Sequence, residues 1–232
     1  MKAPGDLIKE TLAKGQSALS EFESKRFLSY FGIPVSREAI ATDPGSAVTE
    51  AMKIGFPVVL KASGASLFHK TEVEGVVLNL RNKEEVMEES QRLLKIAGCE
   101  ALLVQEMVKG HRELVCGLTR DPQFGPCVMF GLGGILTELI KDVAFRIAPL
   151  SSWDAREMMN EIQCRKVLDP FRGEPGIDLD VLSHTLVALG EIGVQYEEVL
   201  EIDINPLKIR SDGKPVAVDA LVALRVGGTN NS

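Results

Sequence analysis

Three oxygen-bearing side chains alternate with isoleucines near the end of the chain. Glu201, Asp203 and Asn205 are separated by Ile202 and Ile204. Successive side chains of a β-strand point to opposite faces, so the three polar side chains would share one face. Their oxygens suit a hard cation such as Mg²⁺, which takes one or two protein oxygens together with substrate phosphates. A solvated acidic face on an antiparallel strand explains the same pattern equally well.

A fourth oxygen donor, Asp219, follows a hairpin signal. Asp212 and Gly213 form an Asp-Gly pair between apolar runs at 207–210 and 215–219, which is typical of a tight β-turn. We therefore expect Asp219 on the partner strand of this hairpin. From there it could approach the same cation as Asp203 and Asn205.

Two side chains further upstream could handle phosphate. Lys61 ends an apolar run from 56 to 62, and its ammonium could neutralise phosphate oxygens as a compact charge. His69 follows in a polar loop, where a neutral imidazole near a nucleotide could accept a phosphoryl group. An exposed lysine at a strand end and an ordinary loop histidine are the competing interpretations.

Other candidates lie in the middle of the chain. Glu106 stands in the apolar run 101–108, at the seam between two halves, where backbone groups could read an adenine edge. Glu113 could hold a ribose or an ammonium. The glycines of 130–134 match neither common phosphate-loop pattern, so a tight turn explains them as well as a phosphate site does.

The elements that must position these residues change in kind along the chain. Capping and apolar spacing predict helices near 20–31, 44–54, 82–97, 152–162 and 179–192. Strands are predicted near 33–41, 56–62, 75–80, 101–108, 114–119, 127–130, 143–148, 199–204, 207–210 and 215–219. Strands and helices alternate in the first part of the chain, and hairpins dominate later. This order favours two α/β lobes that share a cleft over a single doubly wound sheet.

Composition restricts the partners. With 232 residues, 45% of them hydrophobic and 25% charged, the chain is an ordinary globular protein of one or two domains. A net charge of −7 and 5% aromatic residues argue against nucleic acid. We expect no membrane span or signal peptide, and we read the four isolated cysteines as reduced thiols of a cytoplasmic protein.

Taken together, these stretches resemble the β subunits of ADP-forming acyl-CoA synthetases (acetate–CoA ligases). These belong to the ATP-grasp superfamily and are related to succinyl-CoA synthetase. The resemblance runs from about Ser20 to Arg225. Its most specific parts are Tyr30–Pro34, Pro57–Ala62, His69–Val76, Thr119–Pro126, Phe130–Gly134, Lys141–Arg146 and Asp203–Leu207.

The resemblance implies an ATP-grasp fold of α/β (α+β) class, with two lobes enclosing a nucleotide cleft. The expected division is an N-terminal helical segment (1–19), an N-terminal lobe (20–105) and a C-terminal lobe (106–232). It implies a role for each candidate residue. These are Lys61 and Arg172 on the nucleotide phosphates, Glu106 and Val108 at the adenine hinge, Glu113 near the ribose, Asn205 and Asp219 on Mg²⁺, Asp203 orienting a phosphohistidine, and His69 as a phosphorylatable histidine.

The implied reaction interconverts acyl-CoA, ADP and phosphate with a carboxylic acid, ATP and CoA through a phosphohistidine relay. An α subunit carrying the CoA-binding and ligase domains would be the partner, in an α2β2 heterotetramer, with neither nucleic acid nor membrane involved. Two alternatives stay open. One is an ATP-grasp carboxylate ligase that forms acyl phosphate directly, and the other is a non-catalytic nucleotide-sensing module.

Overall fold

The computed structural model describes residues 3–64, 74–134, 142–171 and 173–226. The chain forms two compact units, each considered by itself below. The smaller unit comprises residues 36–108, and the larger unit comprises residues 1–35 together with 109–232. In this grouping residues 20–35 stand with the C-terminal part, whereas the sequence assigns them to the N-terminal lobe. As boundaries of functional domains, the ranges 1–19, 20–105 and 106–232 stay a prediction.

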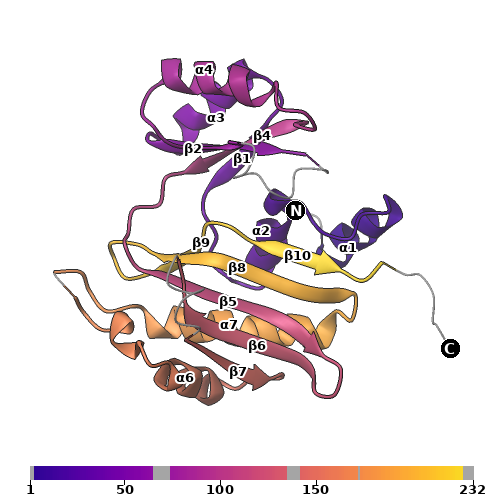
Figure 1. The fold of residues 1–232 in the computed structure, drawn as a ribbon, viewed down its shortest axis with the longest axis vertical. Helices are drawn as coiled ribbons and strands as arrows, with labels where there is room; N and C mark the ends of the chain where they lie inside the picture. Colours follow the sequence, from indigo (N-terminus) through magenta and orange to yellow (C-terminus); the bar gives the residue numbers. More distant parts are fainter. Residues whose placement is uncertain (1–2, 65–73, 135–141, 172, 227–232) are drawn as a thin grey trace. The chain divides into compact units, whose positions relative to one another are not determined.

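The smaller unit is a sheet with two helices. Within its described residues, four antiparallel strands lie in the order β1-β4-β2-β3. Their bounds are β1 Glu38–Ala41, β2 Val58–Ser63, β3 Val76–Leu80 and β4 Ala101–Glu106. Helices α3 (Pro44–Ile54) and α4 (Lys83–Leu93) pack against each other and against the sheet (Figure 1). Apolar side chains from both helices and from β2 and β4 form its core.

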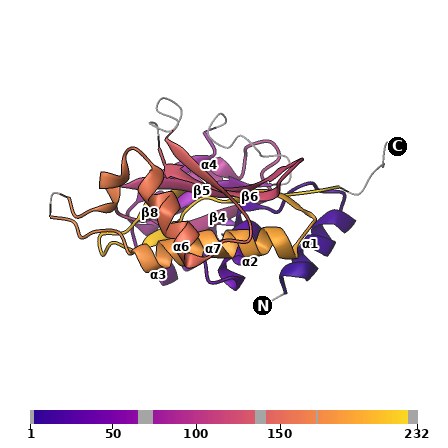
Figure 2. The ribbon, with the colours of Figure 1, turned by 90° about the horizontal axis from the view of Figure 1, so that it is seen from below.

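The larger unit is built on an antiparallel sheet whose described strands run β10-β8-β5-β6-β7, with β9 paired to β8. Their bounds are β5 Glu113–Asp121, β6 Gly125–Leu132, β7 Val143–Ile147, β8 Val199–Ile209, β9 Pro215–Ala217 and β10 Leu221–Leu224. Helix α6 (Ser152–Glu161), the short η1 (Arg165–Leu168) and helix α7 (Leu179–Gln195) follow β7 in the chain. Helices α6 and α7 lie along one face of the sheet (Figure 2).

Residues 3–35 belong to this larger unit because their apolar side chains complete its core. Helices α1 (Pro4–Ala13) and α2 (Glu21–Tyr30) precede the first sheet strand. Phe27 and Leu28 of α2 are fully buried in the same cluster as Ile202 and Val222. The backbone N–H of Leu19 also donates to Val222 O at 3.0 Å. Such long-range packing leaves no local signal in the sequence.

The predicted helix starts are confirmed in detail. Ser20 and Glu23 form a reciprocal capping box at α2. Asp43 caps α3, with Pro44 at the first helical position, and Asn82 caps α4. Each cap satisfies a backbone N–H that has no partner within the helix.

Two predicted strands, 199–204 and 207–210, form one continuous strand β8. Proline has no N–H to donate to a strand partner, so the sequence predicts that the strand ends at Pro206. The pairing of β5 with β8 shifts register between Leu114 and Cys116, opposite the segment that contains Pro206. A bulge at this point lets the strand continue through the proline. No helix among the described residues is long and apolar enough to cross a membrane.

Candidate functional site

Strand β8 presents the alternating pattern that its sequence predicts. Ile202 and Ile204 are buried in the core of the larger unit, at 2% and 0% exposure. Glu201 and Asn205 are exposed and Asp203 is half-buried on the opposite face. The three oxygen-bearing side chains therefore share the sheet face that is turned away from α6 and α7.

Asp219 lies close to this face, although not where the hairpin pattern puts it. The Asp212–Gly213 turn is confirmed, because β9 pairs with β8 directly after it. Strand β9, however, ends at Ala217, and Asp219 stands in the bend before β10. The N–H of Val218 donates to Pro206 O at 3.4 Å, and Leu221 pairs with Asp203. These pairings lay the bend alongside the Asp203–Pro206 stretch of β8.

The charges of this cluster act on Asp203. Burial raises the pKa of its carboxyl above the ordinary value, and the negative charges of Glu201 and Asp219 raise it further. Three acidic side chains thus lie near enough to repel one another. A cation placed among them would relieve that repulsion, which is the electrostatic condition for a metal site.

The donor set fits a magnesium ion held mainly by other ligands. Asn205, Asp203 and Asp219 can each bind a cation through side-chain oxygens, the ligands that hard cations prefer. Among the described residues, no group of three or more His, Cys, Asp or Glu side chains could by itself enclose a metal ion. Mg²⁺ commonly keeps several waters and adds substrate phosphates to one or two protein oxygens, so two protein ligands suffice.

Gly117 of β5 lies next to Asp203 on the neighbouring strand β8, and the sequence motifs above do not include it. It pairs with Asp203 on β8 and with Met129 on β6, and Met129 in turn pairs with Phe145 on β7. A Cβ at position 117 would meet Ile202 O at 2.2 Å. The glycine permits this close approach of β5 to β8, and a lone glycine inside a strand is the signal that could have found it.

Lys61 lies in the smaller unit near the end of β2, as predicted. It pairs with Leu103 of β4 and Val76 of β3, and it is only 7% exposed. Its neighbours Leu60 and Ala62 enter the core beneath α3 and α4, so Lys61 points to the other face of the sheet. Gln105, which pairs with Val59, is a second buried polar residue of this region that the sequence did not reveal.

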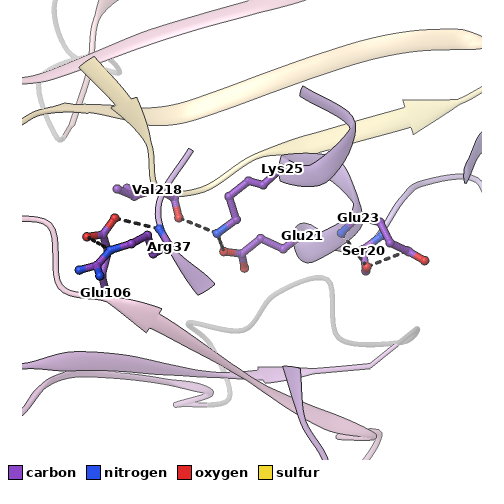
Figure 3. Close-up of polar contacts among 7 residues, drawn as sticks. All are labelled: Ser20, Glu21, Glu23, Lys25, Arg37, Glu106 and Val218. Atoms are coloured by element: carbon purple, nitrogen blue, oxygen red, sulfur yellow. Dashed lines mark hydrogen bonds and ion pairs between the residues drawn. The ribbon is translucent and has the colours of Figure 1, made fainter. Parts of the chain in front are cut away.

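Glu106 ends β4, and its carboxylate is engaged within its own unit. Oε1 accepts a hydrogen bond from the backbone N–H of Arg37 at 2.8 Å, and Oε2 lies 3.3 Å from Arg37 Nε. Figure 3 shows the Arg37 side chain alongside this carboxylate. Val108, two residues further, is buried at 5% exposure. The Glu106 carboxylate is thus engaged by Arg37, and a hinge at this point would act through backbone groups.

Glu113 opens β5 in the larger unit. Its Oε1 lies 3.3 Å from Nζ of Lys208, its partner across the β5–β8 ladder. Its carbonyl accepts from the N–H of Gly133 at 2.8 Å, and a Cβ at Gly134 would stand 2.9 Å from Glu113 Oε2. Gly133 and Gly134, the last two residues of the glycine cluster, therefore lie beside Glu113, which the sequence alone did not indicate.

Two predicted residues, His69 and Arg172, lie outside the described residues. The segments on either side of Arg172 are held by Arg112, which is 7% exposed. Its guanidinium donates to Val167 O and Asp169 O at 3.3 Å and to Pro175 O at 2.6 Å. A buried arginine therefore anchors the described residues that precede and follow position 172.

Known proteins are similar to this chain over most of its length. The family model of the ATP-grasp domain matches residues 10–224. The chain is 37% identical over 226 residues to the subunit beta of acetate–CoA ligase [ADP-forming] I of Pyrococcus furiosus, covering 94% of this chain and 97% of that one. It is also 37% identical over 217 residues to acetate–CoA ligase [ADP-forming] I of Archaeoglobus fulgidus, covering 91% of this chain but only 32% of the relative.

A solved structure shares the fold. It is the dinucleotide-forming acetyl-coenzyme A synthetase 1 of Ca. Korarchaeum cryptofilum, in complex with coenzyme A and Mg-AMPPCP, with its phosphohistidine segment pointing towards the nucleotide-binding site. The TM-score is 0.86 at 42% sequence identity, and the match covers 96% of this chain and 100% of that one.

Proposed function

We propose a function from the premise that this chain belongs to the ATP-grasp domain family and, within it, to the β subunits of ADP-forming acetate–CoA ligases. It is the nucleotide-binding subunit of an ADP-forming acyl-CoA synthetase, an acid–thiol ligase. The reaction interconverts acyl-CoA, ADP and phosphate with a carboxylic acid, ATP and CoA. The observation that carries the assignment of its chemistry is the bend holding Asp219 alongside the Asp203–Pro206 stretch of β8.

The proposed metal ligands are Asn205 and Asp219, with Asp203 close by. The similar structure from Ca. Korarchaeum cryptofilum holds Mg-AMPPCP, which supports Mg²⁺ with ATP or ADP as the substrate of this chain. When bound, Mg²⁺ neutralises charge on the phosphates during phosphoryl transfer. Asn205 and Asp219 would hold the magnesium ion in place. The negative Asp203 orients a phosphohistidine imidazole through its ring N–H.

The remaining contacts are proposed residue by residue. Lys61, a largely buried residue of β2, neutralises phosphate oxygens with its ammonium as a compact point charge. Arg172 also contacts phosphate. The backbone of Glu106 and Val108 reads the edge of adenine, since the Glu106 carboxylate is engaged by Arg37. Glu113 contacts the ribose.

The proposed relay passes through His69. A partner histidine that carries a phosphoryl group donates it to a His69 ring nitrogen, so that one N–P bond breaks and another forms. The His69 N–P bond then breaks as an oxygen of the ADP β-phosphate attacks phosphorus, and ATP forms. A relay suits an enzyme in which acyl-CoA and nucleotide bind to different domains.

The proposed partner is an α subunit with CoA-binding and ligase domains. The match to the relative from Archaeoglobus fulgidus, which is named as the ligase without a subunit designation, covers 32% of that relative's length. This coverage supports the proposal that another chain supplies the remaining domains. We propose an α2β2 assembly. The four cysteines are free thiols, which supports the proposal that the protein functions in the reducing cytoplasm.

The test is reconstitution with the α subunit. The complex is expected to form ATP from acetyl-CoA, ADP and phosphate only with Mg²⁺ present. Lys61→Met should lower this rate at least a hundredfold, whereas Lys53→Met, at an exposed ion pair of α3, should leave it unchanged. Labelled ATP should place acid-labile phosphate on the wild-type chain but not on a His69→Ala chain.

Two results would overturn the proposal. Full ATP synthesis by the His69→Ala complex would exclude the relay and favour direct acyl-phosphate formation. Binding of Mg-ATP without any histidine phosphorylation or ATP synthesis, with the α subunit present, would favour a nucleotide sensor.

A further inference from the structure

Helix α2 contacts the bend that carries Asp219 through two buried polar side chains. Nζ of Lys25, which is fully buried, donates to Val218 O at 3.2 Å and to Glu21 Oε1 at 2.9 Å (Figure 3). Ser24, also fully buried, accepts a hydrogen bond on Oγ from the N–H of Val222 at 3.1 Å. The helix therefore holds the chain one residue before Asp219 and again three residues after it.

The carbonyl that Lys25 binds is the one best placed to orient Asp219. Val218 C=O and the Asp219 N–H belong to one planar peptide unit, so a hydrogen bond to that oxygen fixes the plane from which the Asp219 side chain departs. On the preceding peptide, the N–H of Val218 donates to Pro206 O at 3.4 Å. Pro206 directly follows Asn205. The two peptides around Val218 thus connect Lys25, Asp219 and the neighbour of Asn205.

A buried lysine is a costly way to join two elements. Removing an ammonium from water has a large free-energy penalty, and a pair such as Lys25–Glu21 often contributes no net stability compared with apolar side chains of similar size. Van der Waals packing around Phe27 and Leu28 already attaches α2 to the core. The charged pair therefore points to a task other than holding the helix in place.

We propose that Lys25 is a positioning residue for the magnesium site: it fixes the carbonyl of Val218 and thereby the direction of the Asp219 carboxylate, with Ser24 holding the far side of the bend. This inference rests on the proposed role of Asp219 as a Mg²⁺ ligand. Lys25 does not touch the ion or the nucleotide in this proposal. Its loss lets the bend relax, and the affinity for the metal falls.

The test is metal affinity measured in the complex with the α subunit, with CoA saturating so that ADP binds only at the nucleotide site. The main variant is Glu21→Gln with Lys25→Met, which removes both charges of this ion pair. Titration with Mn²⁺, followed by its paramagnetic resonance signal in the presence of ADP, should show at least tenfold weaker metal binding. Affinity for ADP without metal should change less than twofold, and KM for Mg²⁺ should rise more than kcat falls.

A matched control is Arg120→Met. Arg120 also binds backbone carbonyls through a part-buried cation, donating to Val199 O at 2.6 Å and to Gly193 O and Tyr196 O at 2.7 Å. Those carbonyls lie at the end of α7 and the start of β8, away from the Asp219 bend. Arg120→Met is expected to lower the unfolding temperature without changing Mn²⁺ affinity.

The reference variant Asp219→Ala separates the two hypotheses. If Asp219→Ala weakens Mn²⁺ binding but the Glu21→Gln, Lys25→Met variant binds Mn²⁺ within twofold of wild type, the positioning role is wrong and the ligand assignment stands. If Asp219→Ala itself binds Mn²⁺ normally, both are wrong. Should the double variant fail to assemble, Ser24→Ala takes its place. It should weaken Mn²⁺ binding threefold or more, and unchanged affinity would overturn the inference.

Discussion

Arg37 and Glu106 are joined twice: the Arg37 backbone N–H donates to one carboxylate oxygen of Glu106 at 2.8 Å, and Arg37 Nε lies 3.3 Å from the other. The N–H of Glu106 in turn donates to Arg37 O at 2.9 Å. These contacts fasten the chain just before β1 to the end of β4. The carboxylate therefore stabilises the smaller unit, and in the proposed function the adenine is recognised at this point by backbone groups.

The first prediction concerns Glu106→Gln. An amide oxygen can still accept from the Arg37 N–H, but the charge-assisted part of the bond is lost, so the unfolding free energy should fall by about 1 kcal/mol. Affinity for ADP, measured by calorimetric titration of the complex with the α subunit, should change less than threefold. Arg37→Ala is the control, because it keeps the backbone bond and removes only an exposed guanidinium. A tenfold loss of ADP affinity with unchanged stability would show that the carboxylate itself binds the nucleotide.

The second prediction is a pH dependence at the start of α3. Asp43 Oδ1 accepts from the Ser46 N–H at 2.9 Å, and this bond holds the pKa of Asp43 below its ordinary value of 3.8. A depressed folded-state pKa contributes stability that is present above the unfolded pKa and is lost as pH falls through the folded one. Unfolding free energies of wild type and Asp43→Asn, measured by urea denaturation, should therefore converge below about pH 4.

The asparagine variant makes this comparison specific. Asn caps a helix about as well as Asp does, but it does not titrate in this range. Curves for the two proteins that stay parallel from pH 6 to pH 3 would mean that the cap does not depend on the charge of Asp43.

Local patterns were enough to predict part of the arrangement that the structure shows at the candidate site. The period of two along 201–205 predicts a shared polar face, and the Asp-Gly pair predicts the hairpin that returns the chain towards it. Asp219 is displaced from its expected strand because β9 stops at Ala217. Polar residues that depend on distant partners could not be found. Lys25 has the sequence pattern of an ordinary surface lysine, four residues after a glutamate. Its contact with Val218, 193 residues away, carries its proposed role and has no signal in the sequence.

The same limit applies to Glu106. Its place at the end of an apolar run indicates a hinge, but nothing nearby in the sequence shows that Arg37, 69 residues earlier, engages its carboxylate. The grouping of residues 1–35 with the larger unit has a similar cause, because it depends on side chains of α2 packing against β8 and β10. Sequence periodicity specifies which side chains turn inward, whereas the tertiary pairing of elements decides what they meet.

The third prediction concerns Gly64, which follows β2 and precedes the segment that contains His69. A Cβ at this position would stand 1.9 Å from Gly98 O, while Ser63 O accepts from the Glu100 N–H at 2.8 Å. Gly64→Ala must therefore separate two backbones, which should lower the unfolding free energy by about 2 kcal/mol or more. We also expect histidine phosphorylation of the complex, measured with labelled ATP, to fall. Gly5→Ala in α1 is the control, because nothing lies within 4 Å of its added Cβ.

A Gly64→Ala protein as stable as wild type would mean that the loop at Gly98 can move aside without cost. Loss of stability with normal phosphorylation would separate the backbone contact from the placement of His69. The control should be neutral or slightly stabilising, since alanine is favoured over glycine inside a helix.

The last prediction concerns the acidic cluster without its cation. Burial and the charges of Glu201 and Asp219 raise the pKa of Asp203, so its ionised form is disfavoured in the metal-free protein. Asp203→Asn removes one of the repelling charges. At pH 7 with EDTA, the variant should unfold at a temperature about 2–4 °C higher than wild type, as expected for a gain of up to about 1 kcal/mol. Added Mg²⁺ and ADP should stabilise it less than wild type, because ligand stabilisation scales with affinity.

Catalysis should change in the opposite direction to stability. The Asp203→Asn complex is expected to lose at least tenfold in ATP synthesis, since the amide cannot stabilise a positively charged imidazole ring as a carboxylate does. Glu201→Gln is the matched control, because Glu201 is exposed on the same strand and should give a smaller change in both measurements. A lower unfolding temperature for Asp203→Asn in EDTA, with an unchanged response to Mg²⁺, would mean that Asp203 stabilises the fold instead of serving the site.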